Sequence, residues 1–375
     1  MKLRALVLLS FFVSISLNAQ TLTIGIVAPL TGPVAGYGAF ERDGALLAIQ
    51  EWNAKGGVGG MKIVPIVEDD KANPTMATIA AQKLIQEDVR FLVGDVFSFL
   101  TIPISDVAKA AHVILITPIS TNPAVTLDSS GITKAYVFRA CFSDSFQGGA
   151  GAAFAVNTLK AKNACILSDS TNPYVNGLAG AFEAAFQKAG GAVVGHESYR
   201  DTDHDFSALW AEVKKAAPDL VYFPSGSVQT INSAVRQARE GGVKSVFLGG
   251  DIWDSPELDV VSAEGAYYTE HYWPGEDRRE VQDFQKVYDQ QYYQGRSVAP
   301  DIIAGLSYDA TNVLLQAISA AGANDTDKVK TALEATDYKG VGGRITFNSQ
   351  HDAVKGAVVM HVKDGKVVYD STVLP

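Results

Sequence analysis

The chain has 375 residues, a length that accommodates two or three domains of ordinary size. Hydrophobic residues make up 47% and charged residues 19%, a globular composition that excludes an intrinsically disordered chain. The 31 basic and 41 acidic residues give a net charge of −10 without any basic run, so no nucleic-acid partner is expected.

The N-terminus has the features of a secretory signal peptide (residues 1–19). Lys2 and Arg4 precede an uncharged apolar stretch at residues 5–17, and cleavage is expected after Ala19. The apolar stretch has thirteen residues, fewer than the roughly 20 that a transmembrane helix needs, so a membrane anchor is the weaker alternative. The sequence therefore predicts an exported protein.

Short β-rich runs alternate with segments of helical period in the first third of the chain. The strand-like runs are 23–27, 62–67, 91–94 and 113–116. The helical segments between them are 38–55, 75–86 and 99–111. This alternation predicts a parallel sheet with helices on both faces.

The alternation restarts further along and predicts a second parallel sheet. Its strand-like runs are 136–140, 163–167, 192–197, 220–223 and 245–248, and its helical segments are 147–160, 175–188, 206–216 and 228–240. After a strand-like run at 265–269 come three more helical stretches, 278–293, 302–321 and 327–334. The tail has two strand-like runs around Lys363-Asp364-Gly365, which predicts a hairpin.

The two cysteines, Cys141 and Cys165, leave two possibilities open. An exported protein meets an oxidising compartment, so the pair can form one disulfide. Buried free thiols are the alternative, because the sequence does not give the distance between the two Cα atoms. Two cysteines are too few for a Cys-rich zinc site.

Motifs of common α/β enzymes are missing. The loop at 31–38 lacks the GxGxxG spacing, and Pro33 and Tyr37 crowd the turn that a pyrophosphate would approach. The sequence also lacks a P-loop lysine motif, a GxSxG elbow and HExxH. The acidic run at 201–205 resembles the start of a calcium loop, but Phe206 replaces the required glycine, which favours a helix cap. We therefore expect no enzyme, no cofactor and no metal.

Several motifs resemble one family of transport proteins. They are IGIVAPLTGPVAGYG at 24–38, FLVGDVFS at 91–98, ITPISTNP at 116–123, FRACFSDSFQG at 138–148 and RQAREGG at 236–242. The chain resembles the branched-chain amino-acid (Leu/Ile/Val) binding proteins of ABC transporters, which have the type I periplasmic binding fold. The resemblance implies an α/β clamshell of two lobes, each a parallel sheet flanked by helices, with three interdomain crossings.

The resemblance also implies the domain boundaries. Lobe one would comprise about 20–139 plus 270–341, and lobe two about 140–269 plus 342–375. The ligand would bind between the lobes, outside the carboxyl ends of the strands, where open α/β sheets generally bind ligands.

Five residues match the family's ligand site. By resemblance, Ser98 and Thr121 hold an α-carboxylate, Asp251 pairs with an ammonium group, Tyr174 lies near that ammonium, and Tyr37 lines the cleft. The chemistry of the residues agrees with these roles. Ser98 directly precedes a helical segment, where free backbone N–H groups attract anions, and a tyrosine ring attracts a cation.

Four further candidates flank these positions. Phe97 and Trp253 are candidates for an apolar pocket or for the core, and Ser120 precedes Thr121 in the same turn. Ser227 belongs to the loop Pro224-Ser225-Gly226-Ser227, where the family carries a second cleft tyrosine that is absent here. This difference leaves the ligand open among aliphatic amino acids, amides, urea and aromatic acids.

The resemblance implies a periplasmic solute-binding protein. It would capture a small molecule, with a branched-chain or similar aliphatic amino acid expected first, by closure of the two lobes. The closed form would dock on a membrane permease and its ATPase, and the binding protein itself would be a monomer. A ligand sensor for a separate membrane receptor is the alternative role.

Overall fold

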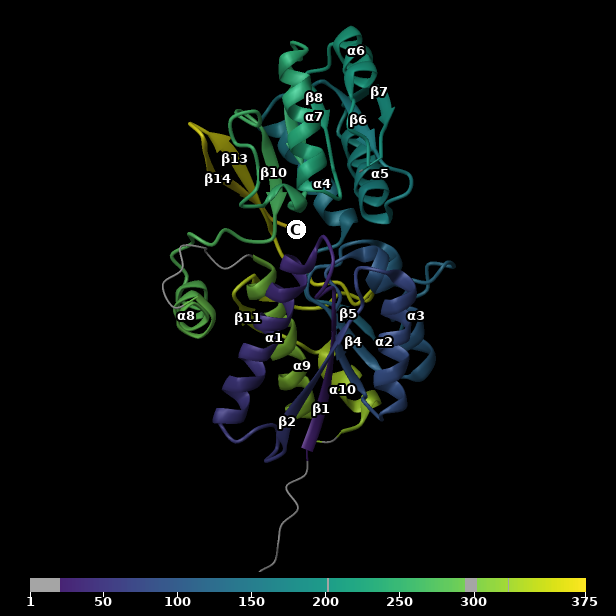
Figure 1. The fold of residues 1–375 in the computed structure, drawn as a ribbon, viewed down its shortest axis with the longest axis vertical. Helices are drawn as coiled ribbons and strands as arrows, with labels where there is room; N and C mark the ends of the chain where they lie inside the picture. Colours follow the sequence, from purple (N-terminus) through teal and green to yellow (C-terminus); the bar gives the residue numbers. More distant parts are fainter. Residues whose placement is uncertain (1–20, 201, 294–301, 323) are drawn as a thin grey trace, which may run out of the picture.

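The computed structural model describes residues 21–200, 202–293, 302–322 and 324–375. The predicted signal peptide lies outside the described residues. Figure 1 shows two α/β lobes stacked along the long axis of the molecule. Among the described residues, no helix has both the length and the hydropathy to cross a membrane.

The first lobe is built on a five-stranded parallel sheet in the order β2-β1-β3-β4-β5. Its strands are β1 (Thr21–Ala28), β2 (Lys62–Asp69), β3 (Phe91–Val93), β4 (Ile114–Thr117) and β5 (Val137–Arg139). The helices between them are α1 (Ala35–Ala54), α2 (Pro74–Gln86) and α3 (Ser98–Ala111), followed by the short turn η1 (Pro123–Val125). The short strands β3, β4 and β5 are buried throughout, as parallel strands covered on both faces must be.

The second lobe contains a seven-stranded sheet in the order β14-β13-β10-β9-β8-β6-β7. Its strands are β6 (Asn163–Ser168), β7 (Ala192–Ser198), β8 (Leu220–Tyr222), β9 (Val246–Gly249), β10 (Tyr267–Glu270), β13 (Ala357–Lys363) and β14 (Lys366–Val373). The helices are α4 (Asp144–Asn157), α5 (Pro173–Lys188), α6 (Ser207–Ala216) and α7 (Val228–Glu240), with the short turn η2 (Asp251–Trp253). The predicted two-lobed fold is therefore confirmed, and β13 and β14 extend the parallel strands in antiparallel pairing. The prediction was wrong for the run at 136–140, which forms β5 at the edge of the first sheet, paired with β4, instead of starting the second sheet.

The hairpin predicted near the C-terminus joins β13 to β14. Lys363 pairs with Lys366, and the two residues between them, Asp364 and Gly365, have φ values of 53° and 69°. Two positive φ values in a two-residue turn match the right-handed twist of the flanking strands, which explains why Asp-Gly forms this turn.

The late helices return to the first lobe. They are α8 (Arg279–Tyr288), which continues into one π-helical turn η3 (Asp289–Tyr293), α9 (Ile302–Ala321) and α10 (Thr326–Glu334). Helix α9 packs along α1, and its buried side chains share an apolar core with β1, β3 and β4. The chain thus passes between the lobes three times.

The third passage lies later in the chain than position 342. The small hairpin of β11 (Tyr338–Gly340) and β12 (Gly343–Ile345) belongs to the first lobe, because Ile345 and Ala353 pack into that lobe's core. The chain rejoins the second sheet only at Ala357, the first residue of β13. We therefore propose lobe one as 21–139 plus 271–353 and lobe two as 140–270 plus 354–375. The strand-like pattern after 343 could not indicate which sheet its residues would join.

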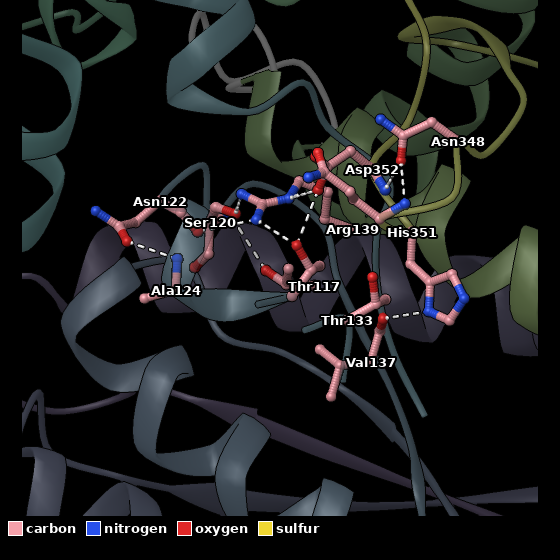
Figure 2. Close-up of polar contacts among 12 residues, drawn as sticks. Thr117, Ser120, Asn122, Ala124, Thr133, Val137, Arg139, Asn348, His351 and Asp352 are labelled. Atoms are coloured by element: carbon pink, nitrogen blue, oxygen red, sulfur yellow. Dashed lines mark hydrogen bonds and ion pairs between the residues drawn. The ribbon is translucent and has the colours of Figure 1, made fainter. Parts of the chain in front are cut away.

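A buried arginine connects the first and third passages, as Figure 2 shows. Arg139 ends β5, and its Nε donates to Asp352 Oδ1 at 2.6 Å. Its Nη1 donates to the Ser120 carbonyl at 2.9 Å, and its Nη2 donates to the Asn122 carbonyl at 2.8 Å. Arg139 thereby fixes the loop that presents Thr121, one of the predicted site residues.

The cysteines are free thiols. Cys141 follows the first passage and Cys165 lies in β6, and both side chains are buried and unbridged. Burial raises the pKa of both thiols to about 12. Of the two alternatives for these cysteines, the structure has buried thiols rather than a disulfide.

The acidic run before α6 forms a local turn. The Asp205 carboxylate accepts from the Ser207 backbone N–H at 2.9 Å, and Phe206 occupies the position that caps the helix. The Asp203 carboxylate accepts from the Arg200 backbone N–H at 2.8 Å. Asp201 lies outside the described residues. These contacts favour the turn-and-helix interpretation of this segment over a calcium loop.

Candidate functional site

A cavity lies between the lobes at the carboxyl ends of strands from both sheets; we call it the inner cavity. It encloses about 640 Å³ of space, part of which is open to solvent. The first lobe contributes Tyr37, Val96, Phe97, Ser98, Phe99, Ile119, Thr121, Ile302 and Ile303, and the second contributes Asn172, Tyr174, Gly226, Asp251, Ile252 and Asp254. Six predicted residues are therefore brought together: Tyr37, Phe97, Ser98, Thr121, Tyr174 and Asp251.

The first-lobe wall is suited to an anion. Ser98 is the first residue of α3; the Leu100 N–H already donates to the Phe97 carbonyl at 3.0 Å, so the donors that the helix start leaves for a ligand are the N–H groups of Ser98 and Phe99. The Ser98 hydroxyl accepts from the Asn122 backbone N–H at 3.3 Å, which leaves its own proton for another acceptor. The positive end of the helix dipole and these donors favour a carboxylate at this point.

Thr121 completes the same wall from the loop after β4. The residue is almost fully buried, and its carbonyl accepts from the Asp144 backbone N–H at 2.8 Å. Arg139 holds the carbonyls of both neighbouring residues in the loop. The hydroxyl of Thr121 is therefore presented by a rigid backbone, which lowers the entropic cost of ligand binding.

The second-lobe wall carries an ionised carboxylate. Asp251 follows β9, and its Oδ1 accepts from the Tyr174 hydroxyl at 2.6 Å and from Gln147 Nε2 at 2.9 Å. Burial by itself would raise the pKa of Asp251, but His271 and these two donors together lower it below the ordinary aspartate value. Asp251 is therefore negatively charged at neutral pH.

The charge of Asp251 has no cationic partner among the described residues. Among the described residues, His271 is the only basic side chain within ion-pair distance of Asp251. Its Nε2 lies 3.6 Å from Asp251 Oδ2. Burial lowers the pKa of His271 to about 4, so its imidazole is neutral at pH 7. A buried carboxylate without a counter-charge is costly unless a cation is supplied, and here it faces an open cavity.

A glycine makes room for the Tyr174 hydroxyl. Tyr174 lies in the first turn of α5, where the Asn172 side chain caps the helix. A Cβ atom on Gly250 would collide with the Tyr174 hydroxyl and would lie 2.7 Å from a methyl carbon of Leu178. The hydrogen bond from Tyr174 to Asp251 therefore depends on glycine at position 250.

The remaining surface of the inner cavity is mostly apolar. Tyr37 and Phe97 meet edge to face with ring centroids 5.8 Å apart. Aliphatic side chains from both lobes complete the lining, namely Val96, Ile119, Ile252, Ile302 and Ile303. The cavity thus combines an anion site and a cation site with an apolar surface.

Three predicted residues do not line the inner cavity. Ser120 is buried behind it, where its hydroxyl donates to the Asp95 carbonyl at 2.8 Å. Trp253 is fully buried in the second lobe's core, and its indole N–H donates to the Phe223 carbonyl at 2.9 Å. Ser227 caps α7 and lines a neighbouring hollow instead. Ser120 and Trp253 thus bond to buried backbone carbonyls, and the Ser227 hydroxyl bonds to the Thr230 backbone N–H and the Gln229 side chain.

Sequence reasoning missed other lining residues. Ile302 and Ile303 begin α9, far along the chain from every other lining residue of the first lobe, and no local pattern marks them. Asp254 also lines the cavity, and its carboxylate accepts from the Tyr268 hydroxyl at 2.7 Å. Its place three residues after Asp251 was the one available signal.

A second buried carboxyl group lies behind Thr121. Asp144 opens α4 and is fully buried, with the Thr121 and Asn122 side chains beside its carboxyl group. Burial raises the pKa of Asp144 to about 7, against the opposing effects of the Thr121 hydroxyl and the Arg139 charge. Asp144 is therefore largely neutral below pH 7, in contrast to Asp251.

Comparison with known proteins identifies the family. The sequence profile of the periplasmic binding protein family matches residues 21–366. This chain belongs to that family. The family expected from the sequence motifs is therefore confirmed.

The relatives of this periplasmic binding protein have similar lengths. A binding protein for leucine, isoleucine, valine, threonine and alanine from Pseudomonas aeruginosa is 31% identical over 94% of this chain and 92% of its own. The leucine-binding protein LivK from Thermotoga maritima is 32% identical over 95% of this chain and 99% of its own, with a TM-score of 0.85. LivJ from Streptococcus pneumoniae, solved with isoleucine, is 29% identical over 95% of this chain and 100% of its own, with a TM-score of 0.83. These relatives are binding proteins rather than enzymes.

Proposed function

We propose that this protein is the solute-binding component of an ABC importer, and that its ligand is an α-amino acid with an apolar side chain. The observation that carries the proposal is the buried, ionised Asp251, which has no cationic partner among the described residues and faces the cavity opposite the N-terminus of α3. An ammonium group would supply the missing positive charge, and a carboxylate would occupy the helix terminus.

A zwitterion matches the two walls because it carries both charges on one carbon. Ser98 and Thr121 would hold its carboxylate, and Asp251 would hold its ammonium group with Tyr174 beside it. The apolar lining between these groups would receive the side chain. A free carboxylic acid would leave Asp251 without a counter-charge, and a simple amine would leave the α3 terminus empty.

The split of these contacts between the lobes explains capture. A ligand that touches only one lobe stabilises the open and closed arrangements equally, so it does not shift the equilibrium between them. An amino acid held by Ser98 on the first lobe and by Asp251 on the second stabilises the closed arrangement alone. Closure is then the signal that a membrane permease would recognise before transport.

The relatives support both parts of the proposal. The Pseudomonas relative is named for binding leucine, isoleucine, valine, threonine and alanine, LivK is named for leucine, and the LivJ structure contains isoleucine. Membership of a periplasmic binding family supports export through the predicted signal peptide, a periplasmic location and the delivery of ligand to a permease and its ATPase. The protein would act as a monomer, since each cleft is built from one chain.

Calorimetry on protein that has been unfolded and refolded to remove any bound ligand tests the proposal. We expect L-leucine, L-valine or a related amino acid to bind, whereas the corresponding amine and carboxylic acid, isoamylamine and 4-methylpentanoate, should bind at least a hundredfold more weakly. Equal binding of 4-methylpentanoate and leucine would refute the role of Asp251. Binding of urea or amides alone would refute the amino-acid ligand.

A further inference from the structure

A second hollow lies beside the inner cavity; we call it the outer hollow. The two share four wall residues, Tyr37, Phe97, Gly226 and Ile252. The outer hollow encloses about 930 Å³, including space open to solvent. The two spaces therefore adjoin along a common wall, and at Gly226 that wall carries no side chain.

The shared wall lies directly beside the groups that hold the ligand. Phe97 immediately precedes Ser98, and Ile252 immediately follows Asp251. A ligand whose carboxylate and ammonium group sit on Ser98 and Asp251 thus has its Cα atom close to both shared apolar residues. A ligand side chain that entered the outer hollow would have to cross the shared wall, and Gly226 is the one shared residue without a side chain to displace.

The outer hollow has a mixed lining. Its first-lobe lining is mainly apolar, with Val34, Phe40 and the shared Tyr37. On the second lobe, the Gln229 amide donates to the Glu257 carboxylate at 2.7 Å, and both side chains are exposed. The lining of the outer hollow therefore combines apolar residues with exposed polar side chains.

We propose that the outer hollow is a side-chain subsite, and that this protein accepts α-amino acids with apolar side chains longer than that of leucine, aromatic ones included. The proposal rests on the amino-acid ligand of the preceding section and goes beyond it by fixing the size of the side chain. Apolar ligand area buried against Tyr37, Phe97 and Ile252 adds affinity in proportion to its extent.

A series of ligands with one head group tests the subsite. Calorimetry with alanine, valine, leucine, norleucine, 2-aminooctanoate and phenylalanine measures how affinity depends on side-chain length. We expect the affinity to keep rising beyond leucine, with 2-aminooctanoate or phenylalanine at least tenfold tighter than valine. An optimum at valine or leucine, with a loss for every longer ligand, would overturn the subsite while leaving the amino-acid site intact.

A filling variant tests the position of the subsite. Gln229→Trp places a large ring at the exposed end of the outer hollow, outside the inner cavity. We expect the ratio of phenylalanine affinity to alanine affinity to fall at least tenfold. Gln187→Trp is the matched control, because it makes the same change at an exposed position of α5 that lines neither space.

The outcomes separate the subsite from the proposed function. An unchanged affinity ratio in Gln229→Trp, with both ligands still bound, would overturn the subsite. If no amino acid binds the unmodified protein, the amino-acid function fails first and the subsite fails with it. If Gln229→Trp does not fold, the length series on the unmodified protein decides the proposal by itself.

Discussion

Arg139 Nε and Asp352 Oδ1 lie 2.6 Å apart, and the arginine side chain is entirely shielded from solvent. The two residues also form a parallel β-bridge, so the first and third passages between the lobes run side by side at this point. The same guanidinium holds the carbonyls on either side of Thr121. One buried ion pair thus connects the passage between the lobes to the wall that we assign to the ligand's carboxylate.

Replacement of Asp352 by alanine should destabilise the protein strongly. The change leaves the Arg139 guanidinium buried without a counter-charge, which costs about 3–5 kcal/mol in the free energy of unfolding. Urea unfolding at pH 7 measures the effect. Asp337→Ala is the control, because its pair with Arg344 is exposed and is worth about 1 kcal/mol or less. Equal effects of the two changes would contradict the proposed importance of the buried pair.

Replacement of Asp251 by alanine should abolish most amino-acid binding. Removal of one partner of a buried charge pair costs about 2–5 kcal/mol, so we expect an affinity loss of roughly 30-fold or more. Calorimetry with the best-binding amino acid measures the loss. Asp277→Ala, which removes an exposed carboxylate of the first lobe, should leave the affinity unchanged. Wild-type affinity in Asp251→Ala would refute the assigned ammonium site.

Replacement of Gly250 by alanine should disturb the site through Tyr174. The new Cβ atom would collide with the Tyr174 hydroxyl, while φ at this position is −98°, which any residue adopts. Overpacking of this kind costs about 1–3 kcal/mol, here expected in both stability and ligand affinity. Gly180→Ala in α5 is the matched control, because its added Cβ meets no atom within 4 Å and should stabilise the helix by up to about 1 kcal/mol. The same response to both changes would refute the packing argument.

Asp144 should make the stability of the protein depend on pH. Burial raises the pKa of Asp144 in the folded protein to about 7. Between about pH 4 and pH 7 the unfolded chain therefore loses this proton while the folded protein keeps it. The free energy of unfolding consequently falls as the pH rises through this window. Above pH 7 the loss of stability from Asp144 is complete.

Asp144→Asn isolates this contribution because the amide cannot ionise. Urea unfolding at several pH values should show that the stability difference between the variant and the wild type shifts by about 2–4 kcal/mol in favour of the variant from pH 4.5 to pH 8. The exposed Asp283→Asn serves as the control and should show no such shift. A difference that stays constant across this pH range would refute a raised pKa at Asp144.

Local sequence patterns predicted most of the secondary structure, although they missed the small hairpin of β11 and β12. Strand-like runs and helical periods predicted the order of the elements, and Asp364-Gly365 predicted its hairpin, because turn geometry depends on a few adjacent residues. Ser98 was expected before a helix and is the first residue of α3 for the same local reason. The family motifs then predicted the two-lobed fold.

The placement of single side chains was decided by the tertiary structure. Trp253 follows Asp251 by two residues, yet its indole is in the core while the aspartate faces the cavity, because the Phe223 carbonyl offers the indole a buried acceptor. Ile302 and Ile303 reach the cavity only because α9 returns to pack on α1. Sequence determined which residues form each strand, helix and turn, since those choices are local. Only the packing of distant elements decided which side chains meet at the cleft, and which carboxyl groups there are charged.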